Sequence, residues 1–174
     1  LVEAMLIPSA NDAAVSLAIY NAGSEENFVK KMNKKAQAWG LSSAQFHNAS
    51  GLDFYSSDDK ILANEMSAYD VLQMTRRALR YDFVKSAVQK TVFEGVSVDE
   101  KFYHTKPSTN QLLGTYLNLK GVKTGYTEKA GQCLVTLGSV DEENQILTVI
   151  LGSIDRFGET EDFLSWVYDS FRWK

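Results

Sequence analysis

Cysteine, proline and histidine are scarce in this sequence, and it has no long apolar run. The single cysteine, Cys133, excludes an intrachain disulfide and a zinc cluster built from thiolates. No stretch reaches the roughly 18 apolar residues that a membrane-spanning helix needs. The two histidines, His47 and His104, have no second ligand at helical spacing, so we predict no metal site and no cofactor. We expect His104 to be half-buried on a strand and Cys133 to be a small buried side chain.

Positive charge is also in short supply, because 18 Lys and Arg residues stand against 22 Asp and Glu residues, a net charge of −4. Proteins that bind nucleic acid usually carry a basic patch, and a pI of about 5.2 gives no case for such a partner. Lys30, Lys31, Lys34 and Lys35 recur at helical spacing and are interpreted as a solvent-exposed helix face. The apolar fraction of 44% and charged fraction of 23% are typical of one globular domain, residues 1–174.

The first part of the domain, residues 1–90, is predicted to be mainly helical. An alanine-rich helix is expected over 11–22, and Ser24 is a candidate N-cap for a second helix that Gly40 ends. Residues 67–70 have the form of a capping box at the start of a third helix. Between these helices, the polar segment 46–63 is predicted to be a loop.

The second part, residues 91–174, favours strands and a final helix. The predicted strands are 91–98, 117–127, 132–140 and 145–154, with a turn at 141–144 between the last two and an amphipathic helix over 163–171. The run 146–151 is almost continuously apolar, as in a strand covered on both faces. We therefore expect an antiparallel sheet with the last helix packed on one face.

Two tripeptides carry the chemistry of interest. Ser9-Ala10-Asn11 lies at the start of the alanine-rich helix, and Lys123-Thr124-Gly125 lies on a predicted strand. Serine-x-asparagine and lysine-threonine-glycine belong to the motif set of class A β-lactamases and penicillin-binding proteins. Either tripeptide alone arises by chance: the first has residues that often cap helices, and a lysine can simply protect an edge strand.

Longer segments around these motifs resemble the low-molecular-mass D-alanyl-D-alanine carboxypeptidases of the penicillin-binding protein and β-lactamase superfamily. The similar segments are 7–14, 46–53, 110–113, 119–127 and 130–134, together with Arg156-Phe157 and Trp166. The resemblance covers nearly the whole chain. It implies an α+β penicillin-binding protein/β-lactamase-like transpeptidase fold, in which α-β-α layers place an antiparallel sheet between helices.

The resemblance assigns catalytic roles to three residues. Ser9 would relay a proton between the nucleophilic centre and the leaving D-alanine nitrogen. Asn11 would donate its side-chain amide to the acyl-side carbonyl of the substrate. Lys123 would place positive charge near the substrate carboxylate and lower the pKa of neighbouring ammonium groups.

Substrate binding is assigned to the same strand, at Lys123, Thr124, Gly125 and Tyr126. Thr124 would hydrogen-bond the substrate carboxylate, and Gly125 would let the substrate backbone pair with the strand. Tyr126 would supply a backbone N–H to the oxyanion hole. For Arg156, a carboxylate-binding role and a surface role stand as equal alternatives.

The family's nucleophile motif, serine-x-x-lysine, does not precede Ser9. The spacing occurs at Ser57 and Lys60, but there it lies in an acidic segment at the wrong place in the family order, so both are interpreted as surface residues. We therefore expect the fold to be incomplete at the N-terminus and the isolated chain to be inactive. The strand at 145–154 should have an unpaired edge, where the chain either dimerises or binds a complementing N-terminal segment.

The resemblance predicts a serine-type carboxypeptidase that removes the terminal D-alanine from peptidoglycan stem peptides, binds β-lactam antibiotics and works in the bacterial cell envelope, outside the cytoplasm. One alternative is a class A β-lactamase-like hydrolase. It is disfavoured because Glu65, Glu94 and Glu100 lack the asparagine four residues on that would mark the water-activating glutamate. The other is a non-catalytic module that binds cell-wall peptide or β-lactam.

Overall fold

The structure is a computed structural model that describes residues 1–141 and 144–172. Its elements are α1 (Val2–Leu6), α2 (Asn11–Ala22), α3 (Glu25–Ala38), β1 (Phe54–Tyr55), β2 (Ile61–Leu62), α4 (Ala68–Ala78), α5 (Asp82–Ala87), β3 (Val92–Val96), β4 (Tyr103–Pro107), β5 (Leu119–Thr127), β6 (Gly131–Ser139), β7 (Gln145–Ser153) and α6 (Arg156–Ser170). Of the turn expected at 141–144, residues 142 and 143 lie outside the described part.

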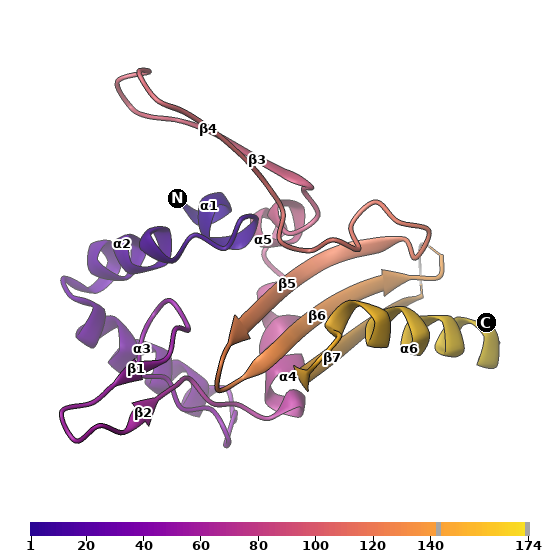
Figure 1. The fold of residues 1–174 in the computed structure, drawn as a ribbon, viewed down its shortest axis with the longest axis horizontal. Coiled ribbons are helices and arrows are strands. Elements are labelled where there is room, and N and C mark those ends of the chain that lie inside the picture. Colours follow the sequence, from indigo (N-terminus) through magenta and orange to yellow (C-terminus); the bar gives the residue numbers. More distant parts are fainter. Residues whose placement is uncertain (142–143, 173–174) are drawn as a thin grey trace.

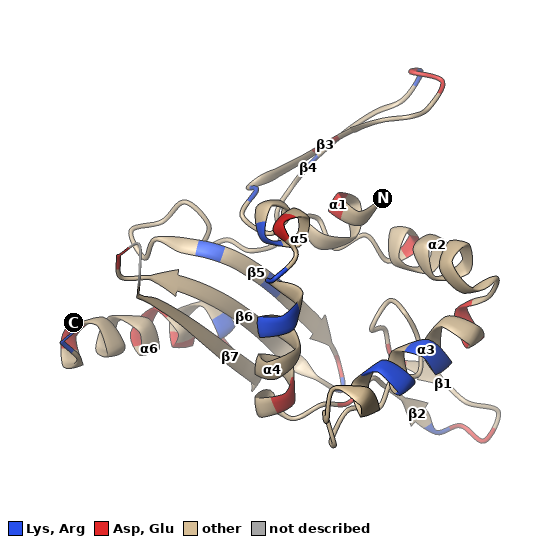
Figure 2. Ribbon diagram, turned by 180° about the vertical axis from the view of Figure 1, so that it is seen from behind, with Lys and Arg blue, Asp and Glu red and all other residues tan. Residues whose placement is uncertain are grey.

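A three-stranded antiparallel sheet in the order β5-β6-β7 forms the middle of the molecule. Helix α6 lies against one face of the sheet and α4 against the other (Figures 1 and 2). This arrangement confirms the predicted α-β-α layers and the three predicted strands. Among the described residues β5 and β7 each have one strand neighbour, so both present an open outer edge.

The core of the sheet lies under α6 and is made almost entirely of leucine. Leu134 of β6 and Leu164 of α6 are 1% and 0% exposed, and they pack with three leucines before and within β5: Leu112, Leu117 and Leu119. Phe157 and Tyr168 of α6 close the margin of this cluster. The strand that carries Lys123 therefore rests on a well-filled core.

The helical part follows the caps that the sequence predicts, with one correction. The Ser24 hydroxyl accepts from the Asn27 backbone N–H, and that of Ser67 accepts from Asp70. The reciprocal half of the predicted capping box is wrong, because the Asp70 carboxylate accepts instead from the backbone N–H and the hydroxyl of Ser43, at 2.9 and 2.6 Å. These bonds hold the pKa of Asp70 below its usual value and tie α4 to the loop that follows α3.

Other expectations need correction. The segment 46–63 is not only loop, since β1 and β2 pair within it as a two-residue ladder. Helix α6 begins at Arg156 rather than 163, because the Asp155 side chain accepts from the Gly158 N–H and caps it there. Cys133 is half-buried rather than buried.

The β3–β4 hairpin projects from the body of the molecule beside α1 (Figure 1). Every residue of β4 is exposed, so His104 lies on a strand as expected but is not half-buried. The four lysines of α3, Lys30, Lys31, Lys34 and Lys35, are exposed as predicted. Helix α3, which carries blue segments in Figure 2, lies to one side of the sheet.

Candidate active site

Ser9 lies in the short connection between α1 and α2, and its side chain is free of any capping role. The N-cap of α2 is Ala10, which forms no side-chain cap, so the capping interpretation of Ser9 and Asn11 is wrong. The backbone of Ser9 has a φ of 61°, a left-handed conformation that is uncommon for a residue with a side chain and is often found at functional sites. The Lys123 Nζ donates to the Ser9 Oγ at 2.5 Å, so the two motifs meet as predicted.

Lys123 is a partly buried cation held by polar partners from two sides. Besides Ser9, its ammonium donates to the carbonyl oxygen of Thr124 at 2.9 Å. Burial, with the positive charge of Arg156 as a second cause, lowers the pKa of Lys123 to about 8. The side chain is therefore largely charged at neutral pH.

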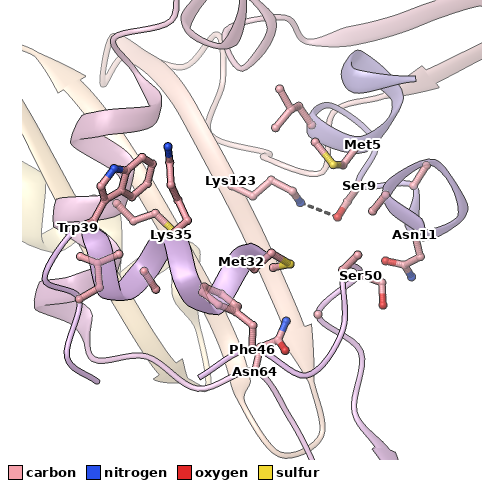
Figure 3. A pocket seen from close by; sticks show the side chains of 18 residues that line it. Met5, Ser9, Asn11, Met32, Lys35, Trp39, Phe46, Ser50, Asn64 and Lys123 are labelled. Atoms are coloured by element: carbon pink, nitrogen blue, oxygen red, sulfur yellow. Dashed lines mark hydrogen bonds between the residues drawn. The ribbon is translucent and has the colours of Figure 1, made fainter. Parts of the chain in front are cut away.

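A cavity of about 550 Å³ opens beside this pair, between the helices and β5. Figure 3 shows Lys123 and Ser9 pointing toward each other, with Asn11 and Ser50 on the same side of the cavity. The remaining lining is mostly apolar and includes Met5, Met32, Trp39, Phe46 and Met74. Polar groups that converge at one end of an apolar cavity are the usual form of a binding or catalytic site.

The loop that brings Ser50 to the cavity is fixed by two asparagines. The side-chain oxygen of Asn64 accepts from the backbone N–H groups of His47 and Asn48, at 2.7 and 3.2 Å. The side-chain oxygen of Asn48 accepts from the Gly51 N–H at 2.6 Å. Sequence reasoning did not single out these asparagines, although asparagine in a polar segment commonly replaces missing backbone hydrogen bonds in this way.

Thr124 is brought next to the cavity but not into its lining. It is only 7% exposed, and its hydroxyl meets the hydroxyl of Thr109 at 2.6 Å. Sequence reasoning missed Thr109, and no pattern in the sequence marks it. The structure thus groups Ser9, Asn11 and Lys123 around the cavity and places Thr124 immediately behind.

Gly125 and Tyr126 continue β5 toward its exposed end. A Cβ at Gly125 would meet nothing closer than the Cβ of Cys133 at 3.7 Å, an ordinary contact, so packing does not require a glycine here. Tyr126 is 64% exposed. A glycine that the fold does not need, on an edge strand, is suited to the close approach of another backbone.

Arg156, at the start of α6, is half-buried and contacts the strand that carries Lys123. Its Nη1 donates to the carbonyl oxygen of Gly125 at 2.9 Å, and its guanidinium lies 4.8 Å from the ring centre of Phe157. Its Nε is buried and has no partner within the described part of the chain. Arg156 therefore adds a second positive charge close to Lys123.

The remaining expectations concern residues outside the cavity, metal binding and membrane-spanning helices. Ser57 and Lys60 are exposed on the β1–β2 hairpin, as interpreted from the sequence. Within residues 1–141 and 144–172 no cluster of three His, Cys, Asp or Glu side chains is arranged to hold a metal. No helix in the same ranges is long and apolar enough to cross a membrane.

Comparison with known proteins supplies the family. A family model described as D-alanyl-D-alanine carboxypeptidase matches residues 1–154. The D-alanyl-D-alanine carboxypeptidase DacF of Bacillus subtilis is 36% identical over 163 residues, which cover 88% of this chain and 37% of that protein.

Solved structures agree with this match. A peptidoglycan synthesis regulatory factor (PBP3) from Streptococcus pneumoniae has a TM-score of 0.83 and 31% identity, over 97% of this chain and 55% of that chain. Penicillin-Binding Protein D2 from Listeria monocytogenes, in its cefotaxime-bound form, has a TM-score of 0.78 and 29% identity, over 96% of this chain and 64% of that chain. The predicted penicillin-binding protein fold is confirmed, and the chain spans less than two thirds of each of these relatives.

Proposed function

We propose that this chain, which belongs to the D-alanyl-D-alanine carboxypeptidase family, forms the substrate-holding and proton-relaying part of a serine peptidase. The substrate class is a peptidoglycan stem peptide ending in D-Ala-D-Ala, from which the terminal D-alanine is removed. The single observation that carries the proposal is the Lys123–Ser9 contact at the polar end of the cavity.

Each group has a task in acyl transfer. An attacking serine passes its proton to its lysine base as its oxygen bonds to the carbonyl carbon of the penultimate D-alanine. The amide bond to the terminal D-alanine then breaks, and water later hydrolyses the acyl-enzyme that is left. The leaving nitrogen must gain a proton, and the Ser9 hydroxyl, next to a lysine with a pKa of about 8, is placed to pass one on. Asn11 lines the same cavity and can hold the acyl-side carbonyl.

The substrate carboxylate would lie near the positive groups at β5. Lys123 and Arg156 supply charge, Thr124 a hydroxyl, and the outer edge of β5 at Gly125 and Tyr126 can pair with the substrate backbone. A β-lactam carries a carboxylate in a comparable position, and the similar Listeria protein is described with cefotaxime bound. We therefore include β-lactams among the ligands of the complete protein.

The nucleophile and its lysine base are proposed to come from a segment outside the 174 residues. The apolar lining of the cavity offers it a place to pack, and the outer edge of β7 offers a strand to pair with. We propose that such a segment, rather than a second copy of this chain, completes the site. Because its substrate would be cell-wall peptide, we further propose that the complete protein acts in the bacterial cell envelope, outside the cytoplasm.

A covalent fluorescent penicillin tests the proposal. The complete protein with its serine-x-x-lysine segment should be labelled, and Lys123→Ala should lower the rate of labelling by roughly 10²–10⁴-fold. Lys30→Ala is the matched control, because Lys30 is exposed on α3, where it pairs with Glu26. The isolated chain should take up no label.

Two outcomes would overturn this account. Stoichiometric labelling of the isolated chain would mean that one of its own serines is the nucleophile, and Ser57 would be the first to replace. If the complete protein stays unlabelled, the non-catalytic binding module becomes the better reading. If it is labelled and turns the penicillin over rapidly without acting on peptides, the β-lactamase alternative replaces the peptidase.

A further inference from the structure

Thr109 and Thr124 form a hydroxyl pair directly behind the proposed carboxylate position. Their oxygen atoms are 2.6 Å apart, and either hydroxyl can be the donor. Thr124 is 7% exposed and follows Lys123 in the chain, while Thr109 comes from the segment after β4. The proposed function gives Thr109 no role.

The backbone of Thr109 also joins the two motif segments. Its N–H donates to the carbonyl oxygen of Ile7 at 3.2 Å, two residues before Ser9. The preceding residue, Ser108, donates its N–H to Thr91 at 2.7 Å. Backbone hydrogen bonds therefore hold both Ser108 and Thr109 in place. Thr109 contacts the connection that carries Ser9 through its backbone, and it contacts β5 through its hydroxyl.

The direction of the hydroxyl pair decides what Thr124 presents to a ligand. Each hydroxyl has one proton, and the contact between them uses one of the two. If Thr109 donates, the proton of Thr124 remains available for an anion. If Thr124 donates, it offers a carboxylate only lone pairs, which repel it. A carboxylate beside Thr124 therefore favours the hydrogen-bond arrangement in which the Thr109 hydroxyl donates to Thr124 and the Thr124 hydroxyl donates to the ligand.

We propose that Thr109 is a positioning residue that orients the Thr124 hydroxyl to donate to the substrate carboxylate, and so helps the site select ligands with a free carboxyl end. This inference rests on the proposed function, since it assumes that Thr124 meets that carboxylate. Thr109 acts only through Thr124 and touches no reacting atom.

The test uses the complete protein and two diacetyl-lysyl-D-alanyl-D-alanine peptides, one with a free carboxylate and one with a C-terminal amide. Thr109→Val keeps the shape but removes the hydroxyl, so kcat/KM for the carboxylate peptide should fall roughly fivefold to tenfold. The already poor kcat/KM for the amide peptide should stay the same. Thr109→Ser, which restores the hydroxyl, should recover most of the loss.

A double-mutant cycle separates positioning from a general structural effect. If Thr109 acts through Thr124, the Thr109→Val and Thr124→Val effects on the carboxylate peptide should not add in the double variant. Thr109→Ala provides a second variant if Thr109→Val does not fold, as judged by circular dichroism. Equal losses for both peptides, or fully additive effects, would overturn the inference while leaving the proposed function intact. Failure of the unsubstituted protein to act on the carboxylate peptide would refute the proposed function, and this inference with it.

Discussion

The two parts of the molecule on either side of the site bury different kinds of side chain. In the sheet part, leucines of β5, β6 and α6 fill a continuous core, with Leu134 and Leu164 at 1% and 0% exposure. In the helical part the buried positions of α2 and α3 are all alanines, and larger side chains such as Met32 and Phe46 line the open cavity instead. The sheet part therefore completes its own core, whereas the helical part leaves apolar surface for something else to cover.

Truncating one large apolar side chain in each part should give the largest effect and should destabilise the two parts to different extents. Leu134→Ala removes packing from a filled core and should destabilise the isolated chain by about 2–5 kcal/mol. Met32→Ala, at the cavity wall, should cost the isolated chain less than about 1 kcal/mol because few contacts are lost. Urea unfolding followed by circular dichroism measures both.

Measuring Leu134→Ala and Met32→Ala in the complete protein tests whether a further segment covers the cavity. If a further segment fills the cavity, Met32→Ala should become clearly more costly there, whereas the effect of Leu134→Ala should not change. Equal effects of Met32→Ala in the two proteins would argue that the cavity stays open.

Replacing Lys123, the partly buried cation where the two parts meet, should give the next largest effect. The lowered pKa of Lys123 means that folding disfavours its charged form, so at neutral pH Lys123→Met should stabilise the fold by roughly 1–3 kcal/mol. The gain should shrink as the pH rises from 8 toward 10.5, because removing the proton from Lys123 costs the native state less free energy as the pH approaches the usual lysine pKa of 10.5. Thermal melting at two pH values checks this, and a loss of stability at neutral pH would show that the Ser9 contact outweighs the cost of burial.

The pH dependence of penicillin acylation should show a smaller but specific effect. Below a pH of about 8 Lys123 is protonated and attracts the ligand carboxylate, and above it the charge is lost, so acylation of the complete protein should decline. Arg156→Met removes a positive neighbour that lowers this pKa, so the alkaline decline should move to higher pH even if acylation is slower overall. An unmoved decline would assign it to another group.

The smallest effect is expected where the two parts meet on the surface. Lys129, in the turn after β5, contacts Glu65 at 2.6 Å, but both side chains are well exposed at 40% and 57%. Glu65→Gln should leave the melting temperature unchanged within error, as should the control Glu26→Gln within α3. A clear drop for Glu65→Gln alone would mean that this ion pair helps hold the two parts together.

The sequence predicted the elements with strong local signals. The alanine-rich stretch became α2 over the predicted residues, the Ser24 cap is present, and the three strands that carry apolar runs form the sheet. The two-residue strands β1 and β2 were missed because they are short, largely exposed and held by pairing with each other rather than by an apolar pattern. The start of α6 was placed too late because Gly158 and the charged residues after it hide the helical period that the Asp155 cap begins.

The site was predictable only in part, for a similar reason. The Ser9–Lys123 contact followed from the resemblance of the two tripeptides to a known family. The contacts of Thr109 and Arg156 join segments distant in sequence, and neither residue type nor spacing indicates such partners. The catalytic and binding roles that the resemblance assigns to Ser9, Asn11, Lys123, Thr124, Gly125 and Tyr126 stay predictions.

The sequence separation between Ser9 and Lys123 has a consequence for how the molecule folds. The strands β5, β6 and β7 follow one another closely in the sequence, so they can pair early, whereas the Ser9–Lys123 contact joins residues 114 positions apart. Closing a loop of that length costs chain entropy before any contact rewards it, so contacts of this kind tend to form late. We therefore expect refolding chains to regain strand structure before the Lys123 ammonium meets Ser9. Any condition that slows docking of the helices onto the sheet would then trap molecules in which the strands are paired but Ser9 and Lys123 have not met.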